Sequence, residues 1–478
     1  MIFFGYWANR GCSKIKGRRT VTQNSESWRL LIVSRNGSEI LLKSDAAGFE
    51  LPQILIPGNQ RIAAGIVRGA EEQLGLRVVA LYEIFPPGQS DRVAESYHAA
   101  VSHCTSQSAP KGLFWTPIQS VLADSHLSGD DRLAVQALWS KWETTKSDPL
   151  AEPFAQPGWF AEVTDWIAKS LDKDSMFLTG SFRQLNASST FSLIQFDTNS
   201  KPVWFKAVGE PNTREFAVTL ALARICPAHL PRVIASEPAW NAWLVEEAGG
   251  TSLAVATRAM AWQTAADCLA RLQLLARTKQ HMIPEYEVRD LRSRRLVALV
   301  PQFFERMEAC QVATGFCGEE LPPATDLPAL RATVIDTLTT LEGLDIPDTI
   351  GHMDLNPHNI FCSDSGSVFL DWAEAFIGCP LFSFEYLVQH FRRTPFAASS
   401  SEEDLRNSYL ACWGCLLPAE NIHAATRLIP LAALFAYAAT LCDDIFSHPP
   451  PLPTQRRYLL QLLRKMNRMS HQPKEVCA

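Results

Sequence analysis

The sequence predicts an α+β protein in which a β-rich first half is followed by a helical second half. Short apolar runs separated by turn residues dominate as far as Gly250, and apolar residues at helical spacing dominate from Thr251 onward. The length of 478 residues also exceeds what one ordinary core accommodates. We therefore expect four parts, in chain order: a domain over residues 25–143, a linker over 144–157, a β-rich lobe over 158–250 and a helical lobe over 251–478.

Composition narrows the class of protein. Apolar residues make up 47% of the chain and charged residues 20%, which is typical of a globular protein. A net charge of -6 argues against nucleic-acid binding and leaves cationic or neutral small molecules open as partners. The 12 scattered cysteines favour reduced thiols, and the close pair Cys412 and Cys415 has no second pair with which to form a metal site. No apolar run approaches a membrane span, so we expect a soluble, cytoplasmic chain without membrane contact.

The first domain is expected to be an α/β domain. Apolar runs over 28–33 and 39–43 flank Asn36-Gly37, a strong hairpin signal. A helix is expected over 61–76, with Gly75 as its C-terminal cap, and strands follow at 78–84 and 96–101. The first two dozen residues are expected to be disordered.

This order of elements resembles a Nudix domain, whose catalytic helix reads R-E-U-x-E-E-x-G-U, where U is aliphatic. Arg68 and Glu72 match that pattern, but Gly69 and Gln73 replace two of its glutamates. The upstream glycine and glutamate of the pattern fall on Ile54 and Gln60. Because hydrolysis of a diphosphate needs several carboxylates around divalent cations, we expect a Nudix-like α/β/α domain that has lost hydrolysis. An unrelated α/β domain is the alternative.

The β-rich lobe begins after a proline-rich segment, Lys146 to Pro157, which we interpret as the core of the linker. A helix is expected over 159–169, and residues 177–194 predict two strands about a polar turn at Asn186 to Ser189.

Lys206 lies in the middle of an apolar strand over 203–208, and Glu215 opens a helical pattern nine residues later. A lysine in such a strand is either a device that keeps an edge strand soluble or an ammonium that grips the α- and β-phosphates of a nucleotide. The carboxylate of Glu215 favours the second interpretation, because it can orient the lysine. Residues 242–250 complete the lobe as a strand and a hinge.

The helical lobe is expected to contain several long helices, and residues 315–326 are expected to form a loop. The expected helices span 265–276, 291–312, 329–341, 384–393, 402–416, 422–441 and 454–469. They would form the wall that binds an acceptor. Asp443-Asp444 is interpreted as a solvated helix end in preference to a site for a cationic substrate.

The segment from Ile350 to Pro380 carries the densest chemical signal. Asp354 is followed five residues later by Asn359, and Asp371 closes the hairpin predicted from the apolar runs 360–362 and 368–370. Phosphoryl transfer needs one carboxylate near the acceptor hydroxyl and two oxygen ligands that hold Mg²⁺ on the nucleotide phosphates. We assign Asp354 to the first task, and Asn359 and Asp371 to the second.

The segment resembles the aminoglycoside phosphotransferase and choline kinase family, in which the catalytic loop reads roughly H-G-D-x-x-x-x-N. The resemblance implies a protein-kinase-like fold of two lobes, with Asp354 as catalytic base and His352 as the scaffold of its loop. It carries over to Lys206 and Glu215, and implies that backbone groups of Glu247 and Ala248 in the hinge pair with a purine. It also implies Mg²⁺ and ATP as cofactors, with GTP not excluded. Met353, Ser383 and Gln273 depart from the residues usual in the family.

These observations predict an ATP-dependent phosphotransferase that acts on a hydroxyl group of a small molecule. Two alternatives remain: a nucleotide-binding pseudokinase with a Nudix-like sensor domain, and a Nudix-type diphosphate hydrolase with a regulatory kinase-like lobe. A zinc site formed by His352, Asp354 and His358 is also conceivable, although no further ligand lies at the right spacing.

Overall fold

The computed structural model describes residues 25–44, 48–58, 60–86, 96–103, 109–123, 127–284, 287–315, 326–447 and 451–471. The expectations for residues 1–24 and for most of the loop 315–326 lie outside these residues. The described residues form two compact units. Among the described residues, the first unit takes in residues 25–216 together with Arg232–Glu247, and the second takes in Ala217–Pro231 and the chain from Ala248.

The first unit begins with a mixed sheet, in which β1 lies centrally. The sheet runs in the order β3-β2-β1-β6-β5, with β4 paired to β1 and β7 paired to β2, and only the β1–β6 pair is parallel among the pairings described. The predicted hairpin is confirmed, because Val33 pairs with Ile40 across a turn in which Gly37 has φ 70°. The strands are β1 Ser25–Val33, β2 Glu39–Ser44, β3 Phe49–Glu50, β4 Gln53–Pro57, β5 Val78–Ile84, β6 Ser96–Ser102 and β7 Leu113–Pro117.

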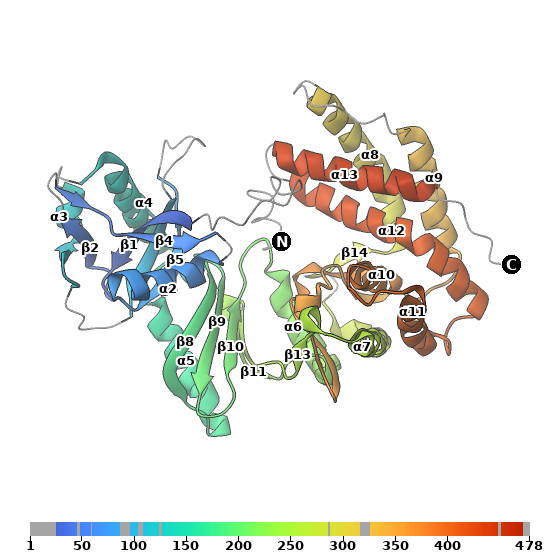
Figure 1. Cartoon of the computed structure of the whole chain (residues 1–478), viewed down its shortest axis with the longest axis horizontal. Coiled ribbons are helices and arrows are strands. Elements are labelled where there is room, and N and C mark those ends of the chain that lie inside the picture. Colours follow the sequence, from blue (N-terminus) through green and yellow to red (C-terminus); the bar gives the residue numbers. More distant parts are fainter. Residues whose placement is uncertain are drawn as a thin grey trace. The chain divides into compact units, whose positions relative to one another are not determined.

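Helices cover both faces of this sheet (Figure 1). Alternate residues of β1 point to opposite faces, as the two-residue period of a strand requires. Leu30 and Ile32 pack in one cluster with α2, Ile62–Leu74, and Leu31 and Val33 pack in another with α4, Gly129–Thr145. The short helix α3, Ile118–Ala123, precedes α4. The expected α/β/α layering is therefore present, and α2 ends, as predicted, at Gly75 with φ 68°.

His98 is a buried histidine in the core of this sheet. Its side chain is only 2% exposed, and its Nδ1 lies 2.8 Å from the carbonyl oxygen of Ala99. Burial lowers the pKa of the imidazole to about 4, against an ordinary value of 6.5. The neutral ring therefore contributes stability that is present above pH 6.5 and is lost as the pH falls toward 4, because the unfolded chain binds the proton more readily.

We expect His98→Asn to lose part of the acid sensitivity of the first unit. Asparagine keeps a donor near the Nδ1 position and does not titrate. Between pH 7 and pH 4.5, the stability advantage of wild type over the variant should shrink by about 2 kcal/mol. Urea unfolding of both proteins at the two pH values measures this difference, and parallel pH dependence in the two proteins would contradict the assignment.

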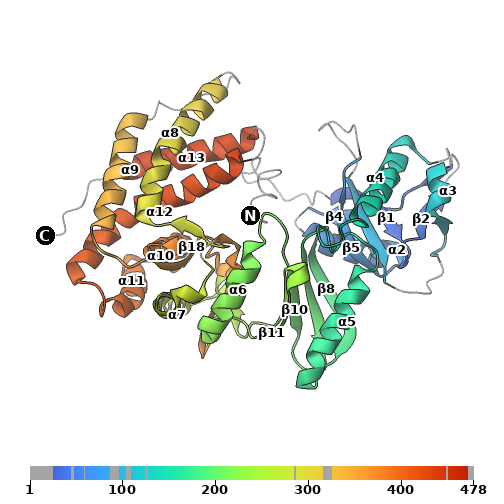
Figure 2. The ribbon, with the colours of Figure 1, turned by 180° about the vertical axis from the view of Figure 1, so that it is seen from behind.

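The second sheet of the first unit is antiparallel, in the order β11-β12-β10-β9-β8. Figure 2 shows α5, Trp159–Leu171, lying along this sheet, where Phe160 and Ile167 share a core with Phe196 and Phe205. The two strands and polar turn expected over 177–194 are confirmed. The strands are β8 Leu178–Ala187, β9 Ser192–Thr198, β10 Val203–Ala207, β11 Val233–Glu237 and β12 Ala242–Glu246.

The segment expected to be a linker is packed into the protein. Phe154 is 1% exposed and Ala155 is fully buried, and the indole nitrogen of Trp142 donates to the carbonyl oxygen of Ala155 at 2.9 Å. These residues belong to a hydrophobic cluster that runs from Leu31 in the first sheet to Leu244 in the second. The two sheets of the first unit thus share one core, and separate folding of residues 25–143 stays a prediction.

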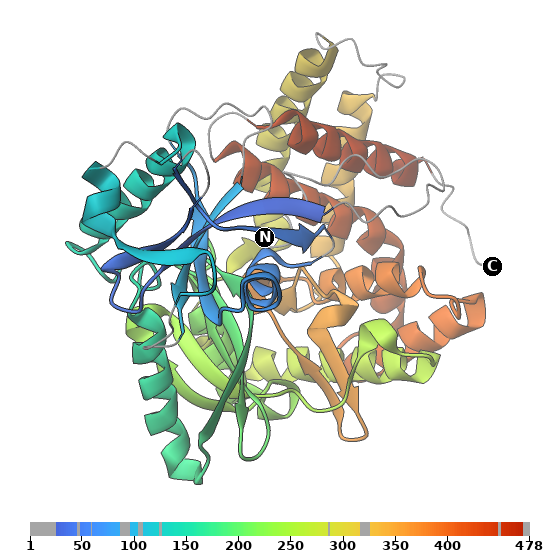
Figure 3. The same cartoon turned by 60° about the vertical axis from the view of Figure 1, so that its left-hand side comes forward.

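The second unit is mostly helical, and the structure contains a helix at each position where the sequence predicts one. Helix α6 starts in the first unit and ends in the second. Helices α8, α9, α12 and α13 pack against one another, as two views show (Figures 1 and 3). The helices are α6 Arg214–Ile225, α7 Ala259–Thr278, α8 Ser293–Gly315, α9 Leu327–Glu342, α10 Leu381–Phe391, α11 Ser399–Trp413, α12 Ala419–Phe446 and α13 Pro453–Ser470.

Two small sheets lie among these helices. One has the order β13-β16-β17 and contains the predicted hairpin, in which Ile360 pairs with Phe369. The other has the order β14-β18-β15, and His352 is the last residue of β15. Their strands are β13 Thr251–Ser252, β14 Arg289–Leu291, β15 Thr349–His352, β16 Ile360–Ser363, β17 Gly366–Phe369 and β18 Ala375–Gly378.

Helix α12 is an exception to the expectation that no segment approaches a membrane span. By length and composition alone it is apolar enough to cross a bilayer, and no other helix among the described residues meets the same test. Of its most apolar stretch, 61% is buried inside the protein, against α8, α9, α10 and α13. Packing in a protein core accounts for such a composition.

Candidate active site

His352 fixes the loop that follows β15. The residue is fully buried, and its backbone N–H donates to Ser383 Oγ at 2.7 Å. The backbone N–H of Asp354 donates to Nδ1 of the ring at 3.1 Å, so the ring proton is on Nε2, which donates to the carbonyl oxygen of Leu370 at 3.0 Å. Burial lowers the pKa of His352, which keeps this neutral form. The ring therefore joins the loop to the end of the hairpin.

Asp354 is partly buried and lies two residues after His352 in the same loop. Its Oδ1 accepts a hydrogen bond from the hydroxyl of Tyr386 at 3.4 Å. Burial raises the pKa of the Asp354 carboxyl, and the charge of Asp371 acts in the same direction. A carboxylate with a raised pKa accepts a proton more readily, which suits a general base.

Asn359 closes the loop at the base of the hairpin. Its Nδ2 donates to the carbonyl oxygen of Asp354 at 3.1 Å, and its own carbonyl oxygen accepts from Leu370 N–H at 2.8 Å. The first bond fixes the orientation of the side-chain amide through its nitrogen, which leaves its oxygen out of this bond. The second bond joins the residue before β16 to the residue after β17. Together with the register of the hairpin, it brings the two arms back to the same end, as predicted.

Asp371 has a strained backbone. Its φ of 66° and ψ of 62° lie in the left-handed region, which residues other than glycine adopt at a cost. The ring of the next residue, Trp372, is tilted by 49° against that of His352, with the ring centres 4.8 Å apart, and its indole nitrogen donates to Phe369 O at 3.3 Å. The contacts of Trp372 thus hold the backbone next to Asp371 in place, and strain of this kind at a carboxylate suggests a functional position.

The donor set of this loop fits magnesium better than zinc. The Asn359 amide oxygen and the Asp371 carboxylate are hard oxygen ligands, of which Mg²⁺ needs few because it keeps water and phosphate oxygens. A zinc site from His352, Asp354 and His358 would have to break a hydrogen bond at one nitrogen of the His352 ring. Among the described residues, no group of three or more His, Cys, Asp or Glu side chains is arranged to hold a metal.

In the first unit, Lys206 and Glu215 form the pair expected from the sequence. Lys206 Nζ lies 2.5 Å from Glu215 Oε1 and 5.7 Å from the centre of the Trp243 ring. Glu215, in the first turn of α6, is 1% exposed. Strand β10 lies between β9 and β12, so Lys206 is not on an edge strand and the solubility interpretation is wrong.

A comparison with known families bears directly on both sets of residues. Residues 209–414 match the model of the phosphotransferase enzyme family, from just after Lys206 to the end of α11. We refer to residues 209–414, which are similar to this family, as the phosphotransferase-family segment. It contains Glu215, Asp354, Asn359 and Asp371.

Several solved structures are similar to part of this chain. A choline/ethanolamine kinase family protein from Mesorhizobium loti is 14% identical, covers 62% of this chain and 90% of its own, and has a TM-score of 0.43. The choline kinase of Streptococcus pneumoniae is 14% identical, with 64% and 99% covered and a TM-score of 0.39. A spectinomycin phosphotransferase, solved with ADP and spectinomycin, is 11% identical, with 64% and 97% covered and a TM-score of 0.37. No curated protein matches the chain.

The hinge expected at Glu247 and Ala248 is only partly available for a base. The backbone N–H of Glu247 donates to the carbonyl oxygen of Pro202 at 3.1 Å, and Gln195 donates to its carboxylate at 2.6 Å. The N–H of Glu247 is therefore used within the first unit. Ala248 is the first residue of the return to the second unit, and its pairing with a purine stays a prediction.

Two departures from the family pattern have clear structural roles in the phosphotransferase-family segment. Ser383 supplies the oxygen that binds the His352 N–H. Gln273, fully buried, donates from Nε2 to the carbonyl oxygens of Ile350 at 3.3 Å and Pro380 at 3.2 Å, and accepts from the Tyr409 hydroxyl at 2.6 Å. The third departure, Met353, is buried in the core of the second unit.

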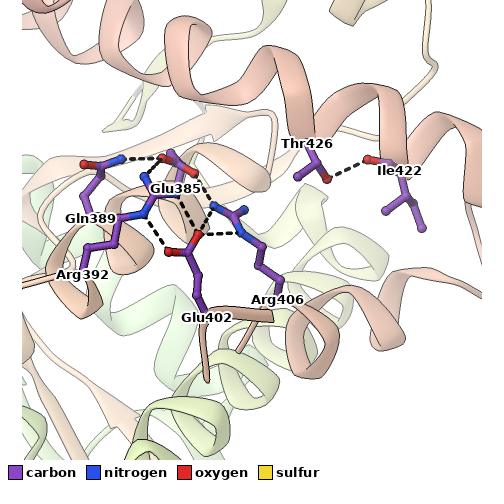
Figure 4. Close-up of polar contacts among 7 residues, drawn as sticks. All are labelled: Glu385, Gln389, Arg392, Glu402, Arg406, Ile422 and Thr426. Atoms are coloured by element: carbon purple, nitrogen blue, oxygen red, sulfur yellow. Dashed lines mark hydrogen bonds and ion pairs between the residues drawn. The ribbon is translucent and has the colours of Figure 1, made fainter. Parts of the chain in front are cut away.

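Tyr386 is a site residue that sequence reasoning missed. It lies on α10 one turn after Ser383, so the two residues share a face of the helix. Figure 4 shows what holds the other side of this helix: Glu385, which is 3% exposed, accepts from Gln389 at 2.6 Å and lies 3.5 Å from Arg406 of α11. The three-residue spacing between Ser383 and Tyr386 was a signal in the sequence that both side chains lie on one face of α10.

The acidic pair at the end of α12 is engaged within the protein. Arg289 donates to both carboxylate oxygens of Asp444, at 3.0 Å and 2.9 Å, and Arg306 lies 3.1 Å from Asp443. Asp444 is therefore not a simple solvated helix end, and a cationic substrate would have to displace arginines to use either residue.

The helix expected to resemble the Nudix box packs closely against β4, and the two residues that replace its glutamates take part in this packing. A Cβ at Gly69 would lie 2.8 Å from Ile54 Cδ1, and one at Gly65 would lie 2.4 Å from Ile56 Cγ2. Gln73 uses both ends of its amide on the backbone of Leu55, at 2.9 Å and 3.0 Å. The two substitutions thus fasten α2 to β4, and the Nudix relationship itself stays a hypothesis.

Proposed function

We propose that the protein is an Mg²⁺-dependent phosphotransferase that moves the γ-phosphoryl group of ATP to a hydroxyl group of a small molecule, with GTP not excluded as donor. One observation carries the proposal. The His352 ring joins Asp354 to Leu370, and the Asn359 side chain joins the same Asp354 backbone. The expected base and one expected metal ligand therefore belong to one hydrogen-bonded loop, next to the second expected ligand, Asp371.

Each residue has a definite role in this reaction. Asp354 takes the proton of the acceptor hydroxyl as the oxygen attacks phosphorus, and Tyr386 orients its carboxylate. Asn359 and Asp371 would hold the magnesium ion, which neutralises charge on the nucleotide phosphates when bound. Lys206 grips the α- and β-phosphates, and Glu215 holds the ammonium in place.

The alternatives have weaker support. Lys206, Asp354, Asn359 and Asp371 are all retained, which is unfavourable to a pseudokinase. The glycine and glutamine that fasten α2 to β4 are unfavourable to a Nudix-type hydrolase. Neither alternative has a contact of its own in its favour.

The test has two stages. Titration calorimetry with MgATP measures binding, and ADP release is then followed across a panel of small hydroxyl compounds, including amino alcohols, sugars and aminoglycosides, with Asp354→Asn as the inactive control. Acceptor-dependent ADP release is the expected result. Binding without turnover for any acceptor would indicate a pseudokinase, and diphosphate hydrolysis lost on Glu72→Gln would indicate the hydrolase.

A further inference from the structure

The turn between β8 and β9 lies at the Lys206 end of its sheet. Leu193 of β9 pairs with Asn186 on one side and with Lys206 on the other, and the turn at Ser188 to Phe191 follows directly. Thr190 in this turn packs against Gly209, two positions after the end of β10, where a Cβ would lie 2.3 Å from Thr190 Cβ. Whatever binds beside the Lys206 ammonium therefore lies near this turn.

The turn contains no glycine, and side chains contribute to holding it in place. Ser188 closes it internally: its N–H donates to Phe191 O at 2.8 Å, and its Oγ accepts from Phe191 N–H at 2.9 Å. Ser189, next in the chain, instead faces outward to the proline-rich segment. Its carbonyl oxygen accepts from Phe154 N–H at 3.0 Å, and its hydroxyl donates to Glu152 Oε1 at 2.9 Å.

Glu152 connects this turn to the first α/β/α layer. The same Oε1 lies 2.6 Å from the ammonium of Lys141 on α4, which also lies 5.0 Å from the centre of the Tyr82 ring on β5. The Lys141 and Glu152 side chains are 30% and 28% exposed, so solvent only partly screens their attraction. Next to them, Phe154 is buried, which anchors the backbone that binds Ser189.

We propose that Glu152 is a positioning residue that holds the β8–β9 turn in place for the nucleotide phosphates beside Lys206. This inference rests on the proposed function, because it assumes a nucleotide at Lys206. The carboxylate acts through Ser189 and touches no substrate. A turn already held in its binding geometry loses less conformational entropy when a nucleotide binds, so the contact strengthens binding.

Three variants separate this role from a general effect on the fold. Glu152→Ala removes both contacts of the carboxylate, Ser189→Ala removes only the hydroxyl that reaches it, and Glu152→Gln keeps an acceptor for that hydroxyl. Glu143→Ala is the matched control, because Glu143 lies on α4, as Lys141 does, and its loss removes an ion pair of 2.6 Å, to Lys146, without touching the turn.

We expect Glu152→Ala to weaken MgATP binding about threefold to tenfold, which is the range that one or two such hydrogen bonds supply. Ser189→Ala should follow it in part, Glu152→Gln should recover most of the affinity, and Glu143→Ala should match wild type. In steady state, Glu152→Ala should raise KM for ATP and leave KM for the acceptor unchanged. Hydrogen exchange at the backbone amides of residues 186–192 should become faster in Glu152→Ala and should stay unchanged in Glu143→Ala.

Wild-type affinity and wild-type exchange in Glu152→Ala would overturn the inference while leaving the proposed function intact. Equal losses in Glu152→Ala and Glu143→Ala would also overturn it, because the effect would then come from the loss of a carboxylate in this part of the first unit and not from the turn. Failure of the wild-type protein to bind MgATP would instead be a failure of the proposed function, and calorimetry on the wild type distinguishes the two cases before any variant is made.

Discussion

Asp354→Asn is expected to lower the turnover number by a factor on the order of 10² to 10⁴, which is the contribution of a positioned general base. Asparagine has the size of aspartate and keeps an oxygen for the Tyr386 hydroxyl, and the backbone bonds of residue 354 to the His352 ring and the Asn359 amide do not involve the side chain. The loop should therefore keep its shape while the proton acceptor is lost.

The measurement is ADP release with the best acceptor from the panel, together with calorimetric titration of MgATP. The affinity for MgATP should stay within about twofold of wild type, because a base for the acceptor does not hold the donor. Tyr386→Phe is the companion variant, since it leaves the carboxylate but removes the bond that orients it, and it should lose far less activity. Full activity in Asp354→Asn would show that the base is another group.

Asp371→Gly is expected to remove metal-dependent nucleotide binding without harming the fold. The carboxylate is one of two oxygen ligands assigned to Mg²⁺, and its loss should weaken MgATP binding by a factor on the order of 10². Because residue 371 has φ 66°, glycine relieves the backbone strain, and the free energy of unfolding should stay within about 1 kcal/mol of wild type.

Asp371→Ala is the matched comparison for this variant. It loses the same carboxylate but keeps a side chain in the left-handed region, so it should be less stable than Asp371→Gly by about 1 kcal/mol. Nucleotide binding with and without Mg²⁺ and urea unfolding of both variants supply the data. Equal MgATP affinity in wild type and Asp371→Gly would remove Asp371 from the metal site, whatever the unfolding data show.

Much of the architecture follows from local sequence signals. Asn36-Gly37, the left-handed Gly75 and the apolar runs around Asn359 each determine a local structure through their own backbone preferences, and the structure has a hairpin, a helix end and a hairpin at those places. The Lys206 pair with Glu215 was also predictable, because a strand and the following helix turn leave few other partners for a buried ammonium.

Long-range packing is what the sequence did not reveal. The prolines of residues 146–157 indicate an irregular backbone but do not tell whether it is exposed, and Phe154 is buried because two sheets meet over it. Gln273 looks like a polar residue in an apolar helix until Ile350, Pro380 and Tyr409 surround it. The bond between Ser383 and His352 joins residues 31 positions apart and has no signal in either segment alone.

The position of Gln184 has a consequence for any attempt to divide the chain. Strand β8 is an edge strand of its sheet. Gln184 on β8 accepts a hydrogen bond from the Ala80 N–H at 2.8 Å and donates one to the Ala80 carbonyl oxygen at 2.9 Å. Strand β5 and helix α2 therefore cover this edge. A fragment that starts at Trp159 would leave this edge strand exposed, and exposed edge strands pair with strands of neighbouring molecules. Aggregation, more than loss of any catalytic group, is then the main obstacle to working with the kinase-like lobes alone.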